Sequence, residues 1–186
     1  GRPQTPTHVV SCPGAHAYRQ ASIKAPETAS LSFGARLTAR RDSADFIETE
    51  LGHVPRAQLN ELPTPKSNAI DTARLFLGTP YLWGGNTRAG IDCSGLIQLA
   101  LNSAGHACPG DSDMQEKDVG QALPEGTQYA PGDLLFWRGH VALVTSPTTM
   151  IHANVHYMSV VEEQIIPALH RITATDTGAL TSHKRL

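Results

Sequence analysis

The chain has 186 residues, of which 40% are hydrophobic, and its formal net charge is −2 at pH 7. This length allows one medium domain or two small ones with packed cores. The small net charge provides no basic stripe for nucleic acid and no polybasic patch for lipid, and no apolar run approaches the roughly 20 residues of a membrane span. We therefore expect no nucleic-acid partner, no membrane partner, and a monomer.

Three cysteines are present, Cys12, Cys93 and Cys108, and no two of them have the CxxC spacing of a redox or zinc motif. Three cysteines cannot all pair within one chain, which favours free thiols in a reducing compartment. The N-terminus also lacks the apolar segment of a signal peptide. These features predict a cytoplasmic protein. A periplasmic or secreted location is the alternative if the sequence begins inside a longer chain.

The first part of the chain, residues 1–62, has short apolar stretches separated by proline, glycine and charged residues, without a helical period. This pattern is typical of several short strands in a small barrel. Pro63 and Pro65 follow in alternate positions and favour an extended backbone. We therefore expect an all-β domain over residues 1–62 and a linker over residues 63–67.

Three helices are predicted after the linker. Ser67 is a candidate N-cap for a helix over residues 69–77, whose apolar residues have helical spacing. A more apolar helix begins near Cys93 and ends before Gly105. Aspartate and serine at the start of residues 111–119 are candidate caps of a short third helix.

From Pro131 the pattern changes to strands, which we expect at residues 133–137, 140–145, 150–153 and 157–162. Helices followed by strands predict an α+β domain, with the helices packed on an antiparallel sheet, rather than an alternating parallel fold. This domain is expected to span residues 68–171. Residues 172–186 are polar and are expected to form a loose C-terminal tail.

Cys93 is the candidate nucleophile because it opens a helix. The helix dipole and the unpaired N–H groups at a helix start favour an anion, so we expect a lowered pKa for this thiol. His140 and His152 each lie on a predicted strand. Cysteine, histidine and a second polar ring can act as nucleophile, general base and orienting group.

Plainer interpretations of these three residues remain open. Cys93 could be a buried structural cysteine, and His152 a strand histidine with a backbone partner. Together with His140 they could also bind zinc, but catalytic zinc sites commonly use closely spaced ligand pairs, which this chain lacks. We therefore expect no metal and no cofactor.

Five segments resemble the NlpC-type family of papain-like cysteine peptidases, which cut bacterial cell-wall peptides. The segments are GTPYLWGG at residues 78–85, DCSGL at 92–96, PGDLLFW at 131–137, GHV at 139–141 and IHA at 151–153. Each is modest alone, but five in this order are highly specific. With weaker motifs, residues 1–62 are similar to the bacterial SH3-like domains that precede such peptidases. Relatives with two SH3-like domains are common, so a first one is expected to be missing here.

The resemblance implies a cysteine endopeptidase that hydrolyses the γ-D-glutamyl–diamino acid bond, as in diaminopimelate-containing stem peptides or muropeptides, through a thioester. It implies Cys93, His140 and His152 as the catalytic triad. It also implies three substrate-binding residues: a Tyr81 hydroxyl near the thiol, and Asp92 and Ser94, which help hold the free amine of an L-Ala end. An N-cap role is nearly as well supported for Asp92 and does not exclude substrate binding.

Smaller features complete the comparison with the family. We expect both tryptophans, Trp83 and Trp137, in the core rather than at the substrate. Relatives often have a basic residue where this chain has Gly110. Two other functions remain open: an amidase or acyltransferase with the same triad, or a non-catalytic wall-binding protein. The presence of all three triad residues argues against a non-catalytic relic.

Overall fold

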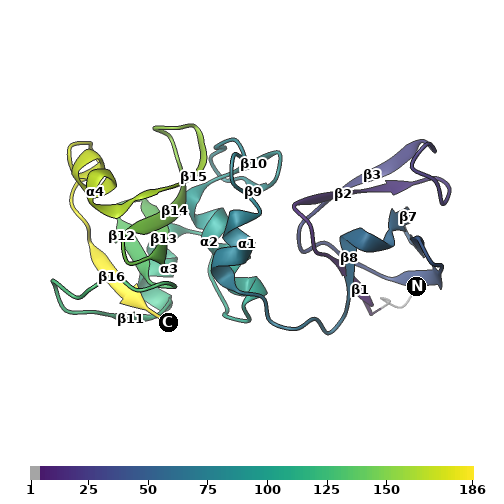
Figure 1. Ribbon diagram of the computed structural model, residues 1–186, viewed down its shortest axis with the longest axis horizontal. Helices are drawn as coiled ribbons and strands as arrows, with labels where there is room; N and C mark the ends of the chain where they lie inside the picture. The colour runs from purple at the N-terminus through teal and green to yellow at the C-terminus, as the bar shows by residue number, and fades with distance from the viewer. Residues whose placement is uncertain (1–4) are drawn as a thin grey trace. The chain divides into compact units, whose positions relative to one another are not determined.

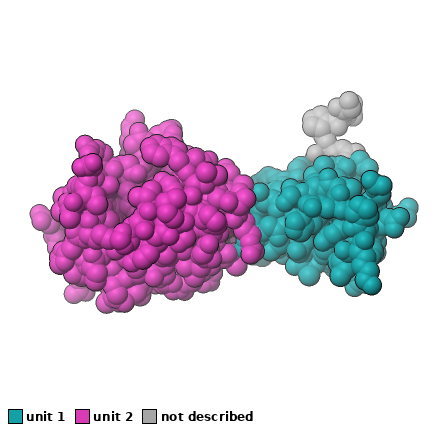
Figure 2. Space-filling model, turned by 90° about the horizontal axis from the view of Figure 1, so that it is seen from above, with its two compact units in different colours: residues 1–65 teal, residues 66–186 magenta. Residues whose placement is uncertain are grey.

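The computed structural model describes residues 5–186. The chain divides into two compact units, residues 1–65 and 66–186, which are coloured separately in Figure 2. Each unit has its own sheets and its own core. No helix among the residues described is both long and apolar enough to cross a membrane.

The first unit is built from short antiparallel strands, as expected from its sequence. They form a three-stranded sheet in the order β4-β1-β8 and a five-stranded sheet in the order β3-β2-β7-β6-β5. Side chains that alternate along these strands, including Ala15, Ala17, Ile47 and Val54, bury one apolar core. The elements are β1 (His8–Val10), β2 (Gly14–Tyr18), β3 (Glu27–Ser32), β4 (Arg36–Leu37), β5 (Ala39–Asp42), β6 (Phe46–Thr49), β7 (Gly52–Pro55), the 3-10 helix η1 (Arg56–Gln58) and β8 (Leu59–Glu61).

The second unit has a six-stranded antiparallel sheet in the order β11-β16-β12-β13-β14-β15, and β9 pairs with β10 in a small separate ribbon. Helices lie on both sides of the large sheet, α1 and α2 on one side and α4 on the other (Figure 1). The elements are α1 (Ala69–Arg74), β9 (Asn86–Thr87), β10 (Gly90–Ile91), α2 (Cys93–Ser103), α3 (Ser112–Asp118), β11 (Gln121–Ala122), β12 (Leu134–Trp137), β13 (His140–Ser146), β14 (Thr149–Asn154), β15 (Ser159–Gln164), α4 (Ile165–Thr173) and β16 (Ser182–Arg185).

The central strands are buried on both faces because helices cover both. On β13, Ala142 and Val144 pack with Ile165 and Ala168 of α4. Val141 and Leu143 point to the opposite face, since successive side chains alternate, and they are fully buried as well. α2 packs against β13 and β14. The expected order of helices before a β-rich region is confirmed, and the structure adds α4 between β15 and β16.

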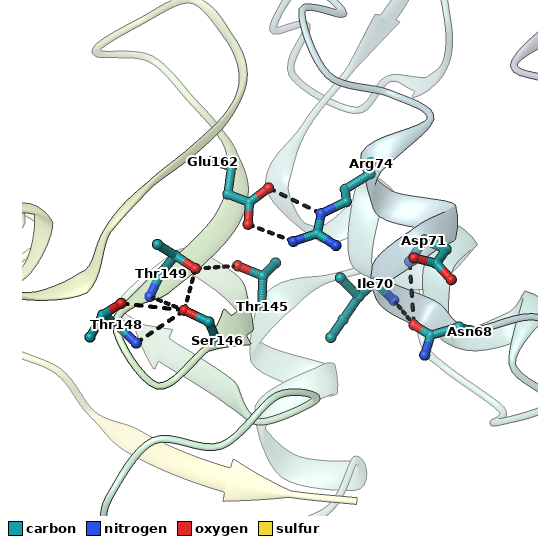
Figure 3. A network of polar contacts seen from close by, with 9 residues as sticks. All are labelled: Asn68, Ile70, Asp71, Arg74, Thr145, Ser146, Thr148, Thr149 and Glu162. Carbon is teal, nitrogen blue, oxygen red and sulfur yellow. Dashed lines mark hydrogen bonds and ion pairs between the residues drawn. The ribbon is translucent and has the colours of Figure 1, made fainter.

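The first helix differs from its prediction at both ends. Asn68, not Ser67, is the N-cap, and its side chain accepts hydrogen bonds from the N–H groups of Ile70 (2.8 Å) and Asp71 (3.3 Å) (Figure 3). The α-helix ends at Arg74 rather than near residue 77. The backbone there changes to the tighter i→i+3 pattern, such as from the N–H of Leu77 to the Arg74 carbonyl.

The expectation of a loose C-terminal tail is wrong. Residues 182–185 form β16, between β11 and β12. Asp133, which is fully buried, accepts hydrogen bonds from Arg185 Nε (2.7 Å) and Nη2 (2.8 Å), and its Oδ2 lies 2.7 Å from His183 Nε2. Hydrogen bonds to a buried polar partner, rather than apolar side chains, hold this strand in the sheet. The polar segment SHKR therefore shows no apolar pattern from which a strand could be predicted.

Asp133 is therefore expected to stabilise the second unit. Burial opposes its ionisation, but the bonds from Arg185 and His183 and the Ala130 N–H outweigh burial and lower the pKa below the ordinary 3.8. The stabilisation is complete above the unfolded pKa and is lost as pH falls through the lower folded pKa. Asp133→Asn should reduce the free energy of unfolding at pH 7 by about 1–3 kcal/mol.

Urea unfolding of both proteins at pH 7 and pH 3 tests this expectation. The difference between wild type and Asp133→Asn should shrink at the lower pH. The exposed Asp118, replaced in the same way, is the control. Equal unfolding midpoints for wild type and Asp133→Asn at pH 7 would refute the role of this carboxylate.

Candidate active site

Asp92 joins the aromatic loop at residues 81–85 to the start of α2. Its Oδ1 accepts a hydrogen bond from the Gly95 N–H (2.7 Å) and its Oδ2 accepts one from the Gly84 N–H (2.7 Å). The Ser94 hydroxyl donates to the same carboxylate over 3.1 Å. The N-cap role expected for Asp92 is confirmed, and Cys93 is the first helical residue after the cap.

Glycine at position 95 allows the loop to lie directly on the first turn of α2. A Cβ atom there would lie 2.5 Å from the backbone oxygen of Gly85, which is closer than any side-chain carbon tolerates. The aromatic loop is thereby placed beside the cysteine.

The Cys93 thiol lies against the beginning of β13. It is 6% exposed, and its Sγ lies 4.0 Å from the Gly139 carbonyl oxygen. The backbone N–H of Val141 also bonds to this sulfur. Gly139 and Val141 flank His140 in the chain, so the thiol lies against the backbone of the strand end that carries the predicted base.

The expected lowering of the Cys93 pKa is wrong for the free protein. This pKa is raised to about 11, chiefly by burial and less strongly by the Asp92 carboxylate, although backbone N–H groups of Val141, Ser94 and Cys93 act in the opposite direction. A helix start favours a thiolate only where desolvation does not outweigh it. The resting thiol is therefore protonated at neutral pH.

His140 lies next to His152, with its Nε2 2.8 Å from the Nδ1 of His152. Its ring also packs against Trp137, at 5.4 Å between centroids. Burial, then the neighbouring His152 and Arg171, lower the pKa of His140 to about 3, although Glu163 acts in the opposite direction. His140 is thus a neutral imidazole at neutral pH, and its Nδ1 is the ring nitrogen that does not face His152.

Three residues that the sequence analysis missed surround the other side of His152. Its Nε2 lies 2.7 Å from Glu163 Oε1 and 3.0 Å from Asn154 Nδ2. Arg171 of α4 donates to both oxygens of Glu163, over 2.5 and 2.8 Å. Burial opposes the ionisation of Glu163, but the bonds from His152 and Arg171 outweigh it and lower the pKa to about 2.

Strand register explains why sequence reasoning missed Glu163. His152 pairs with Val161 across β14 and β15, so Glu163, two residues further on, lies on the same face as a diagonal neighbour. A one-residue shift in register would turn Glu163 to the other face. Only the pairing of these two strands identifies it.

A cavity of about 260 Å³ opens beside the two imidazoles. Tyr81 and Trp83 line it on the loop side, and His156 and Arg171 line it on the side of β14 and α4. Trp137 is buried, as expected, but Trp83 is 87% exposed, so the prediction of a core position for Trp83 is wrong. A larger hollow of about 920 Å³, between loop 123–129 and residues 180–183, contains none of the predicted site residues.

Chemically, the site contains a buried thiol at a helix start, a neutral imidazole at the same strand end, and a second imidazole held by a carboxylate. Such a group of residues can remove a thiol proton during nucleophilic attack. Within residues 5–186, no cluster of three or more His, Cys, Asp or Glu side chains is placed to hold a metal ion.

Residues 78–173 match the NlpC/P60 family. Over 91 residues the chain is 40% identical to dipeptidyl-peptidase 6 of Lysinibacillus sphaericus, covering 48% of this chain and 32% of that protein. Over 158 residues it is 31% identical to the gamma-D-glutamyl-L-lysine dipeptidyl-peptidase of Bacillus subtilis, covering 78% of this chain and 52% of that protein. The chain thus spans about a third to a half of these curated relatives.

The crystal structure of an NlpC/P60 family protein from Bacillus cereus superposes with a TM-score of 0.75 at 26% identity, covering 97% of this chain and 63% of that one. The chain belongs to the NlpC/P60 family and has its papain-like fold. The resemblance found in the sequence motifs of the second unit is confirmed.

The protonated resting thiol leads to a testable pH dependence. Below a pKa of about 11 the thiolate fraction rises about tenfold per pH unit. Alkylation of Cys93 by iodoacetamide, followed by peptide mass spectrometry, should accelerate in that proportion between pH 7 and pH 9. Burial also raises the pKa of Cys108 to about 11, so Cys108 is an internal comparison. A rate for Cys93 that is already constant above pH 6 would indicate a thiolate–imidazolium pair instead.

Proposed function

We propose that this protein is a cysteine endopeptidase that hydrolyses the γ-D-glutamyl–diamino acid bond of peptidoglycan stem peptides or muropeptides. The observation that carries the proposal is the position of the Cys93 thiol between Gly139 and Val141, with His140 bonded to His152 over 2.8 Å. The choice of bond is supported by the relatives, one of which is a gamma-D-glutamyl-L-lysine dipeptidyl-peptidase.

In the proposed mechanism the Cys93 sulfur attacks the γ-carbonyl carbon while His140 takes the thiol proton. The tetrahedral intermediate collapses to a thioester, and His140 returns the proton to the leaving amine. Water then attacks the thioester with His140 as base, which releases the acid and restores the thiol. Because both groups are neutral at rest, the proton transfer accompanies the attack rather than preceding it.

Two donors are proposed to stabilise the oxyanion: the backbone N–H of Cys93 and the Tyr81 hydroxyl. Burial, followed by the nearby Cys93 and Asp92, raises the pKa of Tyr81 above its ordinary 10.0. Tyr81 therefore keeps its proton at neutral pH and remains a hydrogen-bond donor.

Asp92 and Ser94 are proposed to help bind the free amine of the substrate's L-Ala end. The Asp92 carboxylate already accepts three hydrogen bonds, from Gly84, Ser94 and Gly95. A carboxylate has about four acceptor positions, so one remains for a substrate ammonium. The cap and the substrate roles are therefore compatible.

The cavity beside the imidazoles is proposed to receive the leaving diamino acid. His140 must protonate the departing amine, so the departing fragment has to lie on the imidazole side of the thiol. Trp83 and Arg171 line this cavity.

The first unit is proposed to be an SH3-like domain, with support from its short antiparallel strands and from a structural match that extends over 97% of the chain. We also propose that the enzyme is a cytoplasmic monomer that acts on released muropeptides. The three free cysteines support a reducing compartment.

The proposed function is tested with L-Ala-γ-D-Glu-diaminopimelate and the same peptide with an acetylated N-terminus, analysed by mass spectrometry. We expect release of L-Ala-γ-D-Glu from the free peptide only. Cleavage of both peptides would retain the chemistry but contradict amine recognition and favour intact wall as substrate. Cleavage of neither by the folded protein would refute the peptidase and leave a binding role.

Substitutions test the roles of the three catalytic residues. Cys93→Ala should abolish hydrolysis, whereas Cys108→Ala, which removes another buried thiol, should leave it unchanged. His140→Ala should lower kcat about 10³-fold and His152→Ala about 10–100-fold, because an orienting group is less essential than the base. If both folded variants lost the same factor in kcat, the assignment of His140 as base and His152 as orienting group would be contradicted. Hydrolysis retained by Cys93→Ala would exclude the mechanism.

A further inference from the structure

Glu163 lies behind the catalytic histidines and has no part in the mechanism above. Charged and polar groups face it from each neighbouring element. His152 of β14 lies 2.7 Å from its Oε1, Arg171 of α4 donates to both of its oxygens, and the Tyr157 hydroxyl of the β14–β15 connection lies 3.5 Å from its Oε2. Its side chain is only 13% exposed. Water therefore competes little for these contacts.

The proton on His152 Nε2 is determined by two competing neighbours. The Asn154 Oδ1 accepts a hydrogen bond from the Tyr157 N–H (2.9 Å), which turns the Asn154 amide nitrogen toward His152 Nε2 at 3.0 Å. The Glu163 carboxylate is closer, at 2.7 Å. An ionised carboxylate cannot donate, and a charge-assisted bond is stronger than a neutral one. His152 Nε2 therefore carries a proton and donates a hydrogen bond to Glu163.

The proton on His152 Nε2 determines the tautomer of His140. A His152 ring whose single proton is on Nε2 has a lone pair on Nδ1, which accepts from the Nε2–H of His140 across 2.8 Å. Neutral His140 then has its own lone pair on Nδ1. That nitrogen is the one that takes the thiol proton in the proposed function.

We propose that Glu163 is a positioning residue, whose carboxylate fixes the tautomer and orientation of His152 and thereby keeps the Nδ1 of His140 unprotonated for Cys93. Arg171 holds the carboxylate from the other side with two hydrogen bonds. This inference rests on the proposed function, since it assigns a further residue to the same site.

The adjacent residue provides a matched control. Glu162 points to the opposite face of the sheet, where Arg74 of α1 donates to both of its oxygens over 3.1 and 2.9 Å (Figure 3). Its other partners are Thr145 and Thr149. Glu162 and Glu163 thus have the same residue type, strand and form of arginine pairing, but only Glu163 bonds to a catalytic histidine.

The test compares Glu163→Gln with Glu162→Gln. A glutamine amide can donate to His152 Nε2, which favours the opposite tautomer in both rings and leaves His140 without a free Nδ1. We expect kcat to fall about 10–100-fold in Glu163→Gln with KM changed less than about twofold. Glu162→Gln should stay within about twofold of wild type in both constants.

Two measurements need no substrate. Alkylation of Cys93 at pH 7 should slow in Glu163→Gln and not in Glu162→Gln. Imidazole ¹⁵N NMR should show His140 and His152 protonated on Nε2 in the wild type and as mixed tautomers in Glu163→Gln. If Glu163 and Arg171 formed only a structural ion pair, Glu163→Gln would change neither the alkylation rate nor the tautomers.

Because Glu163→Gln leaves Arg171 unpaired, Glu163→Gln/Arg171→Met is a second variant that removes both charges. It should show the same tautomer change and the same slow alkylation. The inference is overturned if folded Glu163 variants match Glu162→Gln in tautomer and alkylation rate. If the wild type does not cleave the peptide, the proposed function fails, and the tautomer and alkylation results still decide the role of Glu163.

Discussion

The register of β13, β14 and β15 is the constraint on which the site depends. It places His140, His152 and Glu163 on one face of the sheet. The His140 ring contacts the His152 ring over 2.8 Å, and the His152 ring contacts the Glu163 carboxylate over 2.7 Å. A shift of one residue between β14 and β15 would remove the carboxylate from this line. The apolar side chains that bury both faces of the central strands make such a shift costly, so the core that stabilises the fold also aligns these three side chains.

Burial determines the charge state of the site. The thiol and the first imidazole are both desolvated, which raises the pKa of Cys93 and lowers that of His140. Both groups are neutral at rest, and the ionised groups, Glu163 and Arg171, pair with each other at the far end of the line. A buried row of polar side chains of this kind is stable because each side chain has a hydrogen-bond partner, as buried polar groups require. The charges of Glu163 and Arg171 are therefore paired rather than isolated.

Part of the site was readable from the sequence. Asp92 before an apolar run predicted a capped helix beginning at Cys93, and the strand-like segments around His140 and His152 predicted strands; both are observed. The tail prediction failed because β16 is held by the buried carboxylate of Asp133, 50 residues away, and not by apolar side chains. The position predicted for Trp83 failed because the loop places the aromatic ring in solvent beside the cavity.

The sequence by itself determined where the helix carrying Cys93 begins, which strands carry the histidines, and the family resemblance, because caps, hydrophobic periods and motifs are local properties of the chain. Only the tertiary structure decided the raised pKa of the thiol, the contact of Glu163 with His152, and the inclusion of residues 182–185 in the sheet. Each of these depends on desolvation or on pairing between distant strands. Both arise only when separate segments pack together and exclude water.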